Sequence, residues 1–232
     1  MIEFFAEWAR LFPELLPGLW VTVQLTVLSL LFGLPLGVVL AVGASTSSRW
    51  VRWPVIALVE IGRGAPALIL LYVVYYGLPQ LGLLLSSFPA AVISIALTTA
   101  AYSSEVFRAG LQSVPRGQRE ASRALGLSSW DEFRLVVLPQ AVRIVIPPLI
   151  GLSIIVFQGT SLAYAVSVPE LLARAYNAGN LTYQFMPPLT LAGAMYAIVS
   201  LVGVALLSMR RRKRRITRRE VRVTNATETI QI

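Results

Sequence analysis

The sequence predicts an all-α membrane protein with five transmembrane helices and a polar insert between the third and the fourth. Three observations carry this prediction. Hydrophobic residues make up 56% of the 232 residues and charged residues only 13%, whereas about a quarter of the residues in soluble domains are charged. Several apolar segments are long enough to cross a bilayer. Arginine gathers in alternate loops between those segments, which indicates a single orientation in the membrane.

The transmembrane domain is predicted to cover residues 19–210. About 20 apolar residues cross the hydrocarbon core as an α-helix. Segments of this kind predict spans at about 19–44, 55–78, 88–110, 139–162 and 187–209. Residues 1–18 lack a basic region followed by an apolar core, so they do not read as a cleaved signal peptide. We expect them to form an external N-terminal segment.

The distribution of Lys and Arg predicts which side of the membrane each loop occupies. The loops 45–54 and 111–138 and the C-terminal tail are rich in arginine. In contrast, the loop 79–87 has no charge, and Arg174 is the single cation of the loop 163–186. With five spans, this pattern places the N-terminus outside and the C-terminus in the cytoplasm.

The basic tail, residues 211–232, follows the last span and begins within the run RRRKRR. Cations in this position are typical of the cytoplasmic end of a transmembrane helix and can contact anionic lipid. We favour this interpretation of the formal net charge of +9 over nucleic-acid binding. We expect the tail to be disordered.

Small residues and prolines predict where the spans pack closely and where they break. Gly33 and Gly37 share one face of the first span, and this spacing lets helix backbones approach each other in lipid. The partner is a helix of the same chain or of another chain. Pro66 and the pair Pro147 and Pro148 mark either breaks or simple kinks. Non-helical backbone is tolerated at this depth where protein or a watery cavity satisfies its polar groups.

A short polar helix bounded by glycines lies between the third and fourth spans. Pro115 suits its first turn, Ser113 is its candidate N-cap, and Gly126 suits the left-handed position that ends a helix. Ser129 and Glu132 form a capping box that predicts a second short helix. Helices this short are marginal alone in water, so the pair must dock, either in a groove or on lipid headgroups. The physics of the residues leaves both alternatives open.

The insert resembles a known family motif. The run EASRALG, from Glu120 to Gly126, is followed after nine residues by VVLP, which ends at Pro139. This arrangement is similar to the EAA motif, E-A-A-x3-G-x9-I-x-L-P, of the membrane subunits of bacterial ATP-binding-cassette (ABC) importers. Ser122 stands in place of the second alanine of the motif, and Val136 stands in place of its isoleucine.

The resemblance covers roughly residues 17–210 and looks like the polar amino-acid branch, the histidine, glutamine and arginine permeases. Matching segments include EIGRGAPALILLYVVYYGLP, LPQAVRIVIPP and TSLAYAVSVPELLARA. It implies a permease subunit of the type I importer fold that moves polar amino acids across the bacterial cytoplasmic (inner) membrane. It also implies that the chain is not an enzyme and binds no cofactor, because ATP and Mg²⁺ are held by a partner ATPase.

In that family the EAA segment is a cytoplasmic coupling helix, which sits in a groove of the ATPase and transmits its closure to the membrane. The resemblance therefore implies a coupling segment over residues 113–138. Its ATPase-coupling residues are Arg116, Gly117, Glu120, Ala121, Ser122, Ala124, Leu125 and Gly126. The implied partners are two ABC ATPase subunits, a second permease subunit, identical or different, and an external solute-binding protein.

Three charged residues, Glu60, Arg63 and Glu105, lie within apolar spans, where a charge is rare and is paired or functional. Arg63 and Glu105 fall at similar depth, so they predict an ion pair between the second and third spans. A gate or a contact with a charged substrate is the alternative. Further candidates for the substrate pathway, toward the outer face, are Gln158, Thr160 and Ser161.

Two departures from the family pattern concern this pathway. Where relatives often read RGTP, this chain reads RGAP, so Ala65 supplies no hydroxyl. Ahead of TSL, relatives often carry Lys-Asp, whereas this chain has Gln158 and Gly159. Charge-based selection of a substrate therefore does not carry over directly.

Two other functional classes fit the sequence less well. A stand-alone ion-coupled amino-acid carrier does not need the insert, and such carriers are often built from internal repeats that are not detectable here. An intramembrane enzyme needs a nucleophile and a base, but the chain has no histidine and no cysteine, which also removes the usual zinc ligands. The phosphate-binding motif G-x-x-x-x-G-K-[ST] is absent from the sequence, so we assign ATP hydrolysis to another chain.

Overall fold

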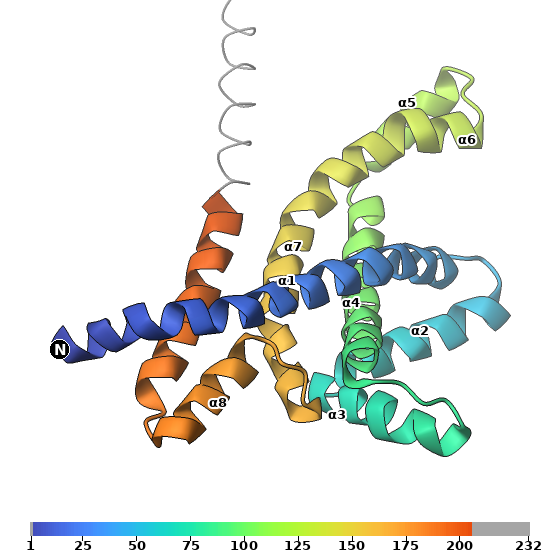
Figure 1. Cartoon of the computed structure of the whole chain (residues 1–232). Helices are drawn as coiled ribbons and strands as arrows, with labels where there is room; N and C mark the ends of the chain where they lie inside the picture. The colour runs from blue at the N-terminus through green and yellow to red at the C-terminus, as the bar shows by residue number, and fades with distance from the viewer. Residues whose placement is uncertain (1, 206–232) are drawn as a thin grey trace, which may run out of the picture. The chain divides into compact units, whose positions relative to one another are not determined.

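The computed structural model describes residues 2–205, and every regular element in that range is helical (Figure 1). The α-helices are α1 (Ile2–Ala44), α2 (Arg49–Gly64), α3 (Ala67–Tyr72), α4 (Ser87–Gln112), α5 (Arg116–Ala124), α6 (Ser129–Asp131), α7 (Leu138–Gly159), α8 (Leu171–Thr182) and a last helix, Met186–Ala205. Short π- and 3₁₀-helical segments continue some of them, namely η1 (Val73–Gly77), η2 (Leu78–Leu81), η3 (Glu132–Val137) and η4 (Thr160–Val166). The tail predicted over 211–232 and the predicted end of the fifth span lie outside the described residues.

Within residues 2–205, four helices are long and apolar enough to cross a membrane, and one bent pair of helices raises the number to five. They are Ala6–Ala44, the pair Arg49–Gly64 and Ala67–Leu81, Ser87–Gln112, Ser129–Val166 and Met186–Ala205. These segments follow the predicted spans in order, although their bounds differ. The all-α prediction is confirmed for the described part of the chain.

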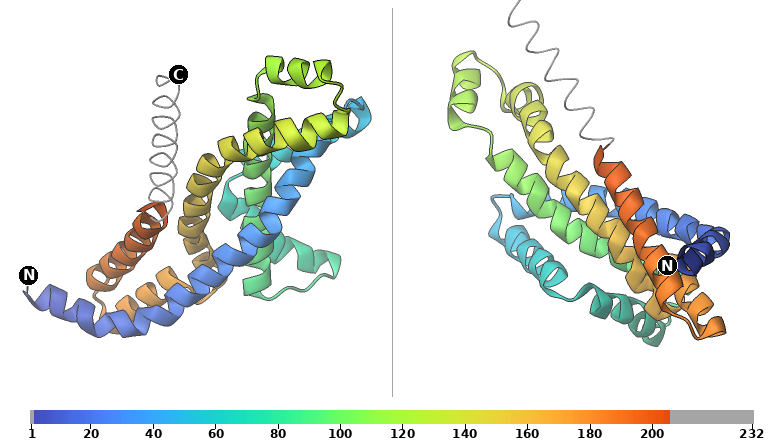
Figure 2. Two further views of the ribbon diagram at one scale, coloured as in Figure 1. Left: turned by 90° about the horizontal axis from the view of Figure 1, so that it is seen from above. Right: turned by 90° about the vertical axis from the view of Figure 1, so that its left-hand side faces the viewer.

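The chain divides into two compact units, one up to Ala192 and one from Gly193. In the first unit, α5 and α6 lie at one end, whereas α3 and α8 lie toward the other (Figure 1, Figure 2). The described part of the second unit is the remainder of the last helix. All of the candidate sites below lie in the first unit.

α1 and α4 pack against each other through small residues. A Cβ atom added at Gly33 would lie 2.7 Å from the Cβ of Thr99, and one added at Gly37 would overlap the hydroxyl of Ser103. Ala41, one turn further along α1, is buried. The predicted close approach is confirmed, and its partner is a helix of the same chain.

An apolar core joins elements that are distant in sequence. Leu25 of α1, Leu71 of α3, Ala91 of α4 and Val166 of η4 belong to one cluster of buried side chains. Burial of apolar surface between protein elements fixes them relative to one another, because core packing is dense. This core therefore connects the second half of the bent pair to the two long helices.

The predicted second span, 55–78, is not one continuous helix. α2 ends at Gly64 and the helical chain resumes at Ala67, with a bend of 106° between the two parts. Pro66 has no N–H group, and its ring disfavours helical backbone in the residue before it. Ala65 is accordingly extended, with φ −74° and ψ 135°.

The proline pair in the fourth span behaves differently. α7 continues through Pro147 and Pro148, so the break that these residues could have marked is not present. Transmembrane helices tolerate proline where neighbouring groups re-satisfy the freed carbonyls. The predicted span 139–162 is the central part of a longer helical segment, Ser129–Val166.

α8 occupies part of the predicted loop 163–186. Its N-cap is the buried Glu170, whose carboxylate accepts hydrogen bonds from the N–H groups of Leu172 (2.8 Å) and Ala173 (2.7 Å). The Leu171 N–H donates to the hydroxyl of Thr22 on α1 (3.2 Å). Glutamate is not among the usual N-caps, and Thr22 is far away in sequence, so local sequence does not indicate this helix.

α1 begins at Ile2 rather than at residue 19, and it includes Pro13 and Pro17. Gly18 allows α8 to approach, since a Cβ atom added there would lie 2.9 Å from the carbonyl oxygen of Glu170. The residues predicted to form an external segment are therefore part of a continuous helix. Their external position stays a prediction.

Candidate functional site

The polar insert contains two short helices, α5 and α6 (Figure 1), and Gly126 lies in the connection between them. Gly126 has a φ of 77°, the left-handed conformation predicted for it. Its N–H donates to the carbonyl of Arg123 (2.9 Å), and the N–H of Leu127 donates to the carbonyl of Ser122 (3.2 Å). A left-handed glycine with such bonds is a common way to end a helix.

Both predicted N-caps in the insert are wrong. The Ser113 hydroxyl donates to the carbonyl of Gly110 (2.7 Å), so it belongs to the end of α4 and does not cap α5. The N-cap position of α5 is Pro115, which has no side-chain cap.

α6 is capped one residue earlier than predicted. The Ser128 hydroxyl accepts a hydrogen bond from the Asp131 N–H (3.1 Å) and donates to the Asp131 carboxylate (2.6 Å). The predicted box of Ser129 with Glu132 is not formed. Glu132 turns instead to another helix of the insert.

An ion pair between a buried acid and an exposed arginine joins η3 to α5. Arg123 Nε lies 2.8 Å from Glu132 Oε2; the side chain of Glu132 is 6% exposed and that of Arg123 is 69% exposed. This hydrogen bond raises the pKa of Arg123 above its ordinary value. Arg119 adds a second attachment, because its Nη2 donates to the carbonyl of Leu111 at the end of α4 (3.0 Å).

Apolar contacts support the same junction. Val114, Val137 and Ala141 are buried together, with Leu111 and Phe133 packed against them. This cluster joins the end of α4 to η3 and α7. The insert is therefore held by its own chain at its base.

The outer surface of α5 is free of such contacts among the described residues. The predicted coupling residues that are exposed are Arg116, Gly117, Glu120, Ala121, Ala124, Leu125 and Gly126. The eighth, Ser122, is buried, and its hydroxyl donates to the carbonyl of Arg119 (2.8 Å). Leu125 is 81% exposed, so a large apolar side chain stands beside small residues on a polar helix. Such a surface is suited to a protein partner.

The three charged residues of the spans meet near the bend of the second span. Arg63 Nη1 lies 3.3 Å from Glu60 and 3.9 Å from Glu105, so the expected approach of Arg63 to Glu105 is present. Glu105 has a closer partner, Arg108, at 2.6 Å and 3.0 Å. The Tyr102 hydroxyl also donates to the carbonyl of Arg63 (3.1 Å).

Arg108 and Tyr102 are residues that the sequence prediction did not assign to this group. Both could have been found from spacing, because Arg108 lies three residues after Glu105 and Tyr102 lies three residues before it. Residues three apart are neighbours on a helix surface.

The outer candidates lie at the junction of α7 and η4. Thr160 is buried and its hydroxyl donates to the carbonyl of Phe157 (2.7 Å). The Ser161 hydroxyl donates to the carbonyl of Gln158 (2.8 Å), and Gln158 is exposed. These two hydroxyls thus donate to carbonyls of their own helical turn rather than to the charged group near Arg63.

A cavity of about 390 Å³ lies between the bend, α4 and α7. Ala65 and Ala67 line it at the bend, and Gly159 lines it at the end of α7. Four residues of α4 that carry a hydroxyl group also line it, namely Ser94, Thr98, Thr99 and Tyr102. Three of them, Ser94, Thr98 and Tyr102, are spaced four residues apart, a pattern that the sequence could have shown. Tyr102 also contacts Arg63, so the cavity adjoins the charged group. A mostly apolar cavity with a few polar groups is typical of a small-molecule site.

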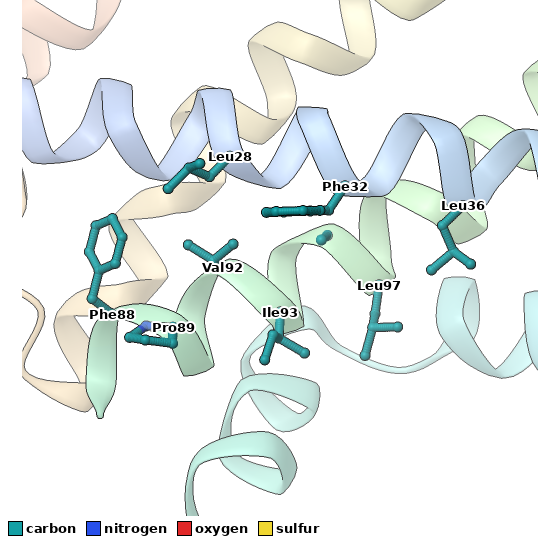
Figure 3. A pocket seen from close by; sticks show the side chains of 9 residues that line it. Leu28, Phe32, Leu36, Phe88, Pro89, Val92, Ile93 and Leu97 are labelled. Atoms are coloured by element: carbon teal, nitrogen blue, oxygen red, sulfur yellow. The ribbon is translucent and has the colours of Figure 1, made fainter. Parts of the chain in front are cut away.

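A second cavity, of about 450 Å³, lies between α1 and α4 (Figure 3). Leu28, Phe32 and Leu36 line it on α1, and Val92 and Leu97 are among its residues on α4. Its lining has no polar side chain, so it offers nothing to orient a polar solute. The cavity beside Tyr102 is the better candidate for the substrate pathway.

No group of three or more acidic side chains in the described residues could hold a metal ion.

Residues 33–219 match the family described as the binding-protein-dependent transport system inner membrane component. That match spans most of the chain. The chain belongs to this family. As an inner membrane component, it is the membrane subunit of a transporter.

Individual relatives agree with this family. The probable amino-acid ABC transporter permease protein YckA of Bacillus subtilis (strain 168) is 34% identical over 194 residues, which are 83% of this chain and 86% of that protein. The arginine transport system permease protein ArtQ of the same strain is 35% identical over 191 residues, 82% of this chain and 87% of that protein. A chain in the crystal structure of an amino acid ABC transporter with histidines superposes on this inner membrane component with a TM-score of 0.85 at 30% identity, covering 90% of this chain and 98% of that chain.

Proposed function

We propose that this chain is the permease subunit of an importer for polar amino acids, driven by a separate ATPase that docks on the insert. Two kinds of relative support the substrate class: YckA is described as an amino-acid permease and ArtQ as an arginine permease. ATP and Mg²⁺ are bound by the ATPase, and this chain positions the solute and the coupling helix.

The proposed orientation has the N-terminus outside, and the insert and the C-terminus in the cytoplasm. The arginine-rich connection after α1 lies beside the insert, since Ala44, Arg52 and Arg119 line one pocket. The charge-poor loops adjoin α3 and α8, which lie toward the other end of the first unit (Figure 2). The difference in basic residues between the two ends supports this orientation.

The observation that carries the proposal is an exposed face on a helix that is anchored at its base. Ala121 and Leu125 face outward, while Arg123 and Arg119 attach α5 to its own chain. A partner that pushes on this face pushes on the ends of α4 and α7 as well. A loosely attached helix would absorb such a movement instead.

A continuous helical segment leads from the insert to the cavity. It runs over Ser129–Val166 and contains Glu132, which holds α5, and Gly159, which lines the cavity. Packed helices shift as units because their interfaces are bistable rather than continuously deformable. Movement of the insert is thereby linked to the shape of the substrate pathway.

The other proposed partners are a second permease subunit, identical or different, a second ATPase subunit and an external solute-binding protein. Ile155 lines the cavity and is 65% exposed. A second permease subunit against α7 would cover this side chain and complete the wall of the pathway. The solute would pass from the binding protein into this space and then to the cytoplasm.

Co-purification from native membranes tests the proposal. We expect an ATPase to be recovered with the wild-type chain and lost with Leu125→Glu, because a charge on an apolar docking residue opposes burial. Leu181→Glu is the matched control, since Leu181 is 85% exposed on α8, away from the insert. It should retain the ATPase.

Transport in proteoliposomes completes the experiment. Uptake of a polar amino acid should require ATP, the ATPase and the binding protein. Uptake by the purified chain alone, driven by an ion gradient, would instead establish a stand-alone carrier and overturn the proposal.

A further inference from the structure

A basic pocket lies where α1, α2, α4 and the insert meet, and the proposed transport cycle does not use it. Its volume is about 640 Å³, within the range of small-ligand sites. Arg52, Arg108 and Arg119 line it, and its lining residues include no carboxylate. The pocket is therefore electrostatically suited to an anion.

Two of the three arginines keep capacity for a ligand. Arg108 is paired with Glu105 (2.6 Å), and Arg119 donates one hydrogen bond to a backbone carbonyl. Arg52 lies over the ring of Trp53, 5.8 Å from its centroid. A guanidinium group has five N–H donors, so one backbone bond leaves Arg119 with several. Arg52 and Arg119 thus present positive charge that no lining residue neutralises.

One side of the pocket is apolar and aromatic. Trp53, Ile56 and Phe133 belong to its lining, and the neighbouring Trp50 is 92% exposed. Tryptophan is enriched at the level of the lipid headgroups. A ligand that combines an anion with an apolar body would match both sides, whereas a free inorganic anion would match only the arginines.

We propose that this pocket binds the headgroup of an anionic phospholipid, with the phosphate held by Arg52 and Arg119 and the apolar part against Trp53 and Ile56. Arginine recognises phosphate through paired charge-assisted hydrogen bonds, and basic pockets between transmembrane helices bind lipid headgroups in this way. The assignment of this lipid to the cytoplasmic leaflet rests on the proposed orientation. Because Arg52 is on α2 and Arg119 on the insert, the lipid would connect the bent span to the coupling segment.

The test measures which lipid stays bound to the full chain. The chain is purified with its partners and reconstituted in nanodiscs of phosphatidylcholine, with or without phosphatidylglycerol. Native mass spectrometry should show phosphatidylglycerol retained in preference to phosphatidylcholine. Arg52→Gln should weaken this retention about fivefold, the factor that corresponds to about 1 kcal/mol per arginine near an anionic lipid. Ser45→Glu, which places a carboxylate in the lining without removing an arginine, should weaken it as well.

Arg49→Gln is the matched control, because Arg49 is exposed on the same helix and lies outside the lining. Equal losses for Arg49→Gln and Arg52→Gln would mean a diffuse surface charge, and equal retention of the two lipids would mean no anion site. Displacement of the lipid by soluble glycerol phosphate would identify a site for soluble phosphate esters. Each of these results overturns the proposal. ATPase recovery is recorded on the same samples, so failure of the lipid site is distinguished from failure of the proposed function.

Discussion

Two groups of opposite charges in this chain are built differently. In the insert, one acid meets one arginine, since Glu132 lies 2.8 Å from Arg123. At the bend of the second span, one acid lies between two arginines, since Glu105 is 2.6 Å from Arg108 and 3.9 Å from Arg63. The first acid is almost fully buried, whereas the second is part-exposed.

This difference indicates which acid is restricted to one arginine partner and which acid can exchange one arginine for another. Within residues 2–205, Glu132 forms an ion pair with Arg123 and with no second arginine, so it must keep Arg123 or remain buried with an uncompensated charge. Glu105 lies close to both Arg108 (2.6 Å) and Arg63 (3.9 Å), so a shift of its carboxylate toward either arginine would leave it a charged partner. A fixed pair suits the base of the proposed coupling helix, and a pair that can exchange suits the proposed substrate pathway, which must open and close.

Breaking the fixed pair should have the largest effect. Arg123→Gln leaves the carboxylate of Glu132 buried without its partner, so we expect loss of the ATPase and of transport. Glu132→Gln should do less harm, because the exposed Arg123 is solvated by water. Measurements of thermal unfolding and of ATPase recovery for the two variants show which substitution causes the larger loss. Equal or reversed effects would contradict the asymmetry of burial on which this prediction rests.

Breaking the exchangeable group at its shared acid should have an intermediate effect. Glu105→Gln removes the carboxylate common to Arg63 and Arg108, and hydrogen bonds to charged groups contribute about 1.5–3 kcal/mol. We expect transport to fall about tenfold while the ATPase is still recovered. Glu60→Gln is the control, because this exposed acid forms an ion pair with Arg63 at 3.3 Å and such exposed pairs contribute less than about 1 kcal/mol. Unchanged transport in Glu105→Gln would show that this charged group has no role in the substrate pathway.

Removing one neutral hydrogen bond beside this group should have the smallest effect. Tyr102→Phe deletes the donor to the Arg63 carbonyl and retains the ring. A bond of this kind contributes about 1 kcal/mol, so we expect at most about a fivefold change in the concentration of solute that gives half-maximal transport. A large loss of assembly in this variant would show that Tyr102 supports the fold rather than the pathway.

The sequence predicts well those features that depend on nearby residues. The spacing of Gly33 and Gly37 indicates a close helix contact, and Gly126 indicates a left-handed turn; both are present. The approach of Arg63 to Glu105 follows from their depth in the spans. In each case the residue type itself limits the conformation or the partner.

Features set by distant contacts could not be predicted in the same way. Pro66 ends a helix and Pro147 does not, although both lie in apolar segments. α8 is capped by the buried Glu170, and the N–H of its first residue, Leu171, donates to the hydroxyl of Thr22. Ser128 rather than Ser129 caps α6, a difference of one residue that leaves Glu132 available to Arg123. The surrounding structure decides each of these outcomes.

Cysteine cross-linking in native membranes tests the central claim most directly, namely that the insert is the cytoplasmic docking site of an ATPase. The chain has no cysteine, so each introduced thiol is the single reactive site of its variant. Leu125→Cys should cross-link to an ATPase and should be protected from a membrane-impermeant thiol reagent added outside intact cells. Leu181→Cys should form no cross-link to an ATPase, and the reagent added outside should label it. Labelling of Leu125→Cys from outside, or an ATPase cross-linked at Leu181→Cys instead, would contradict the account.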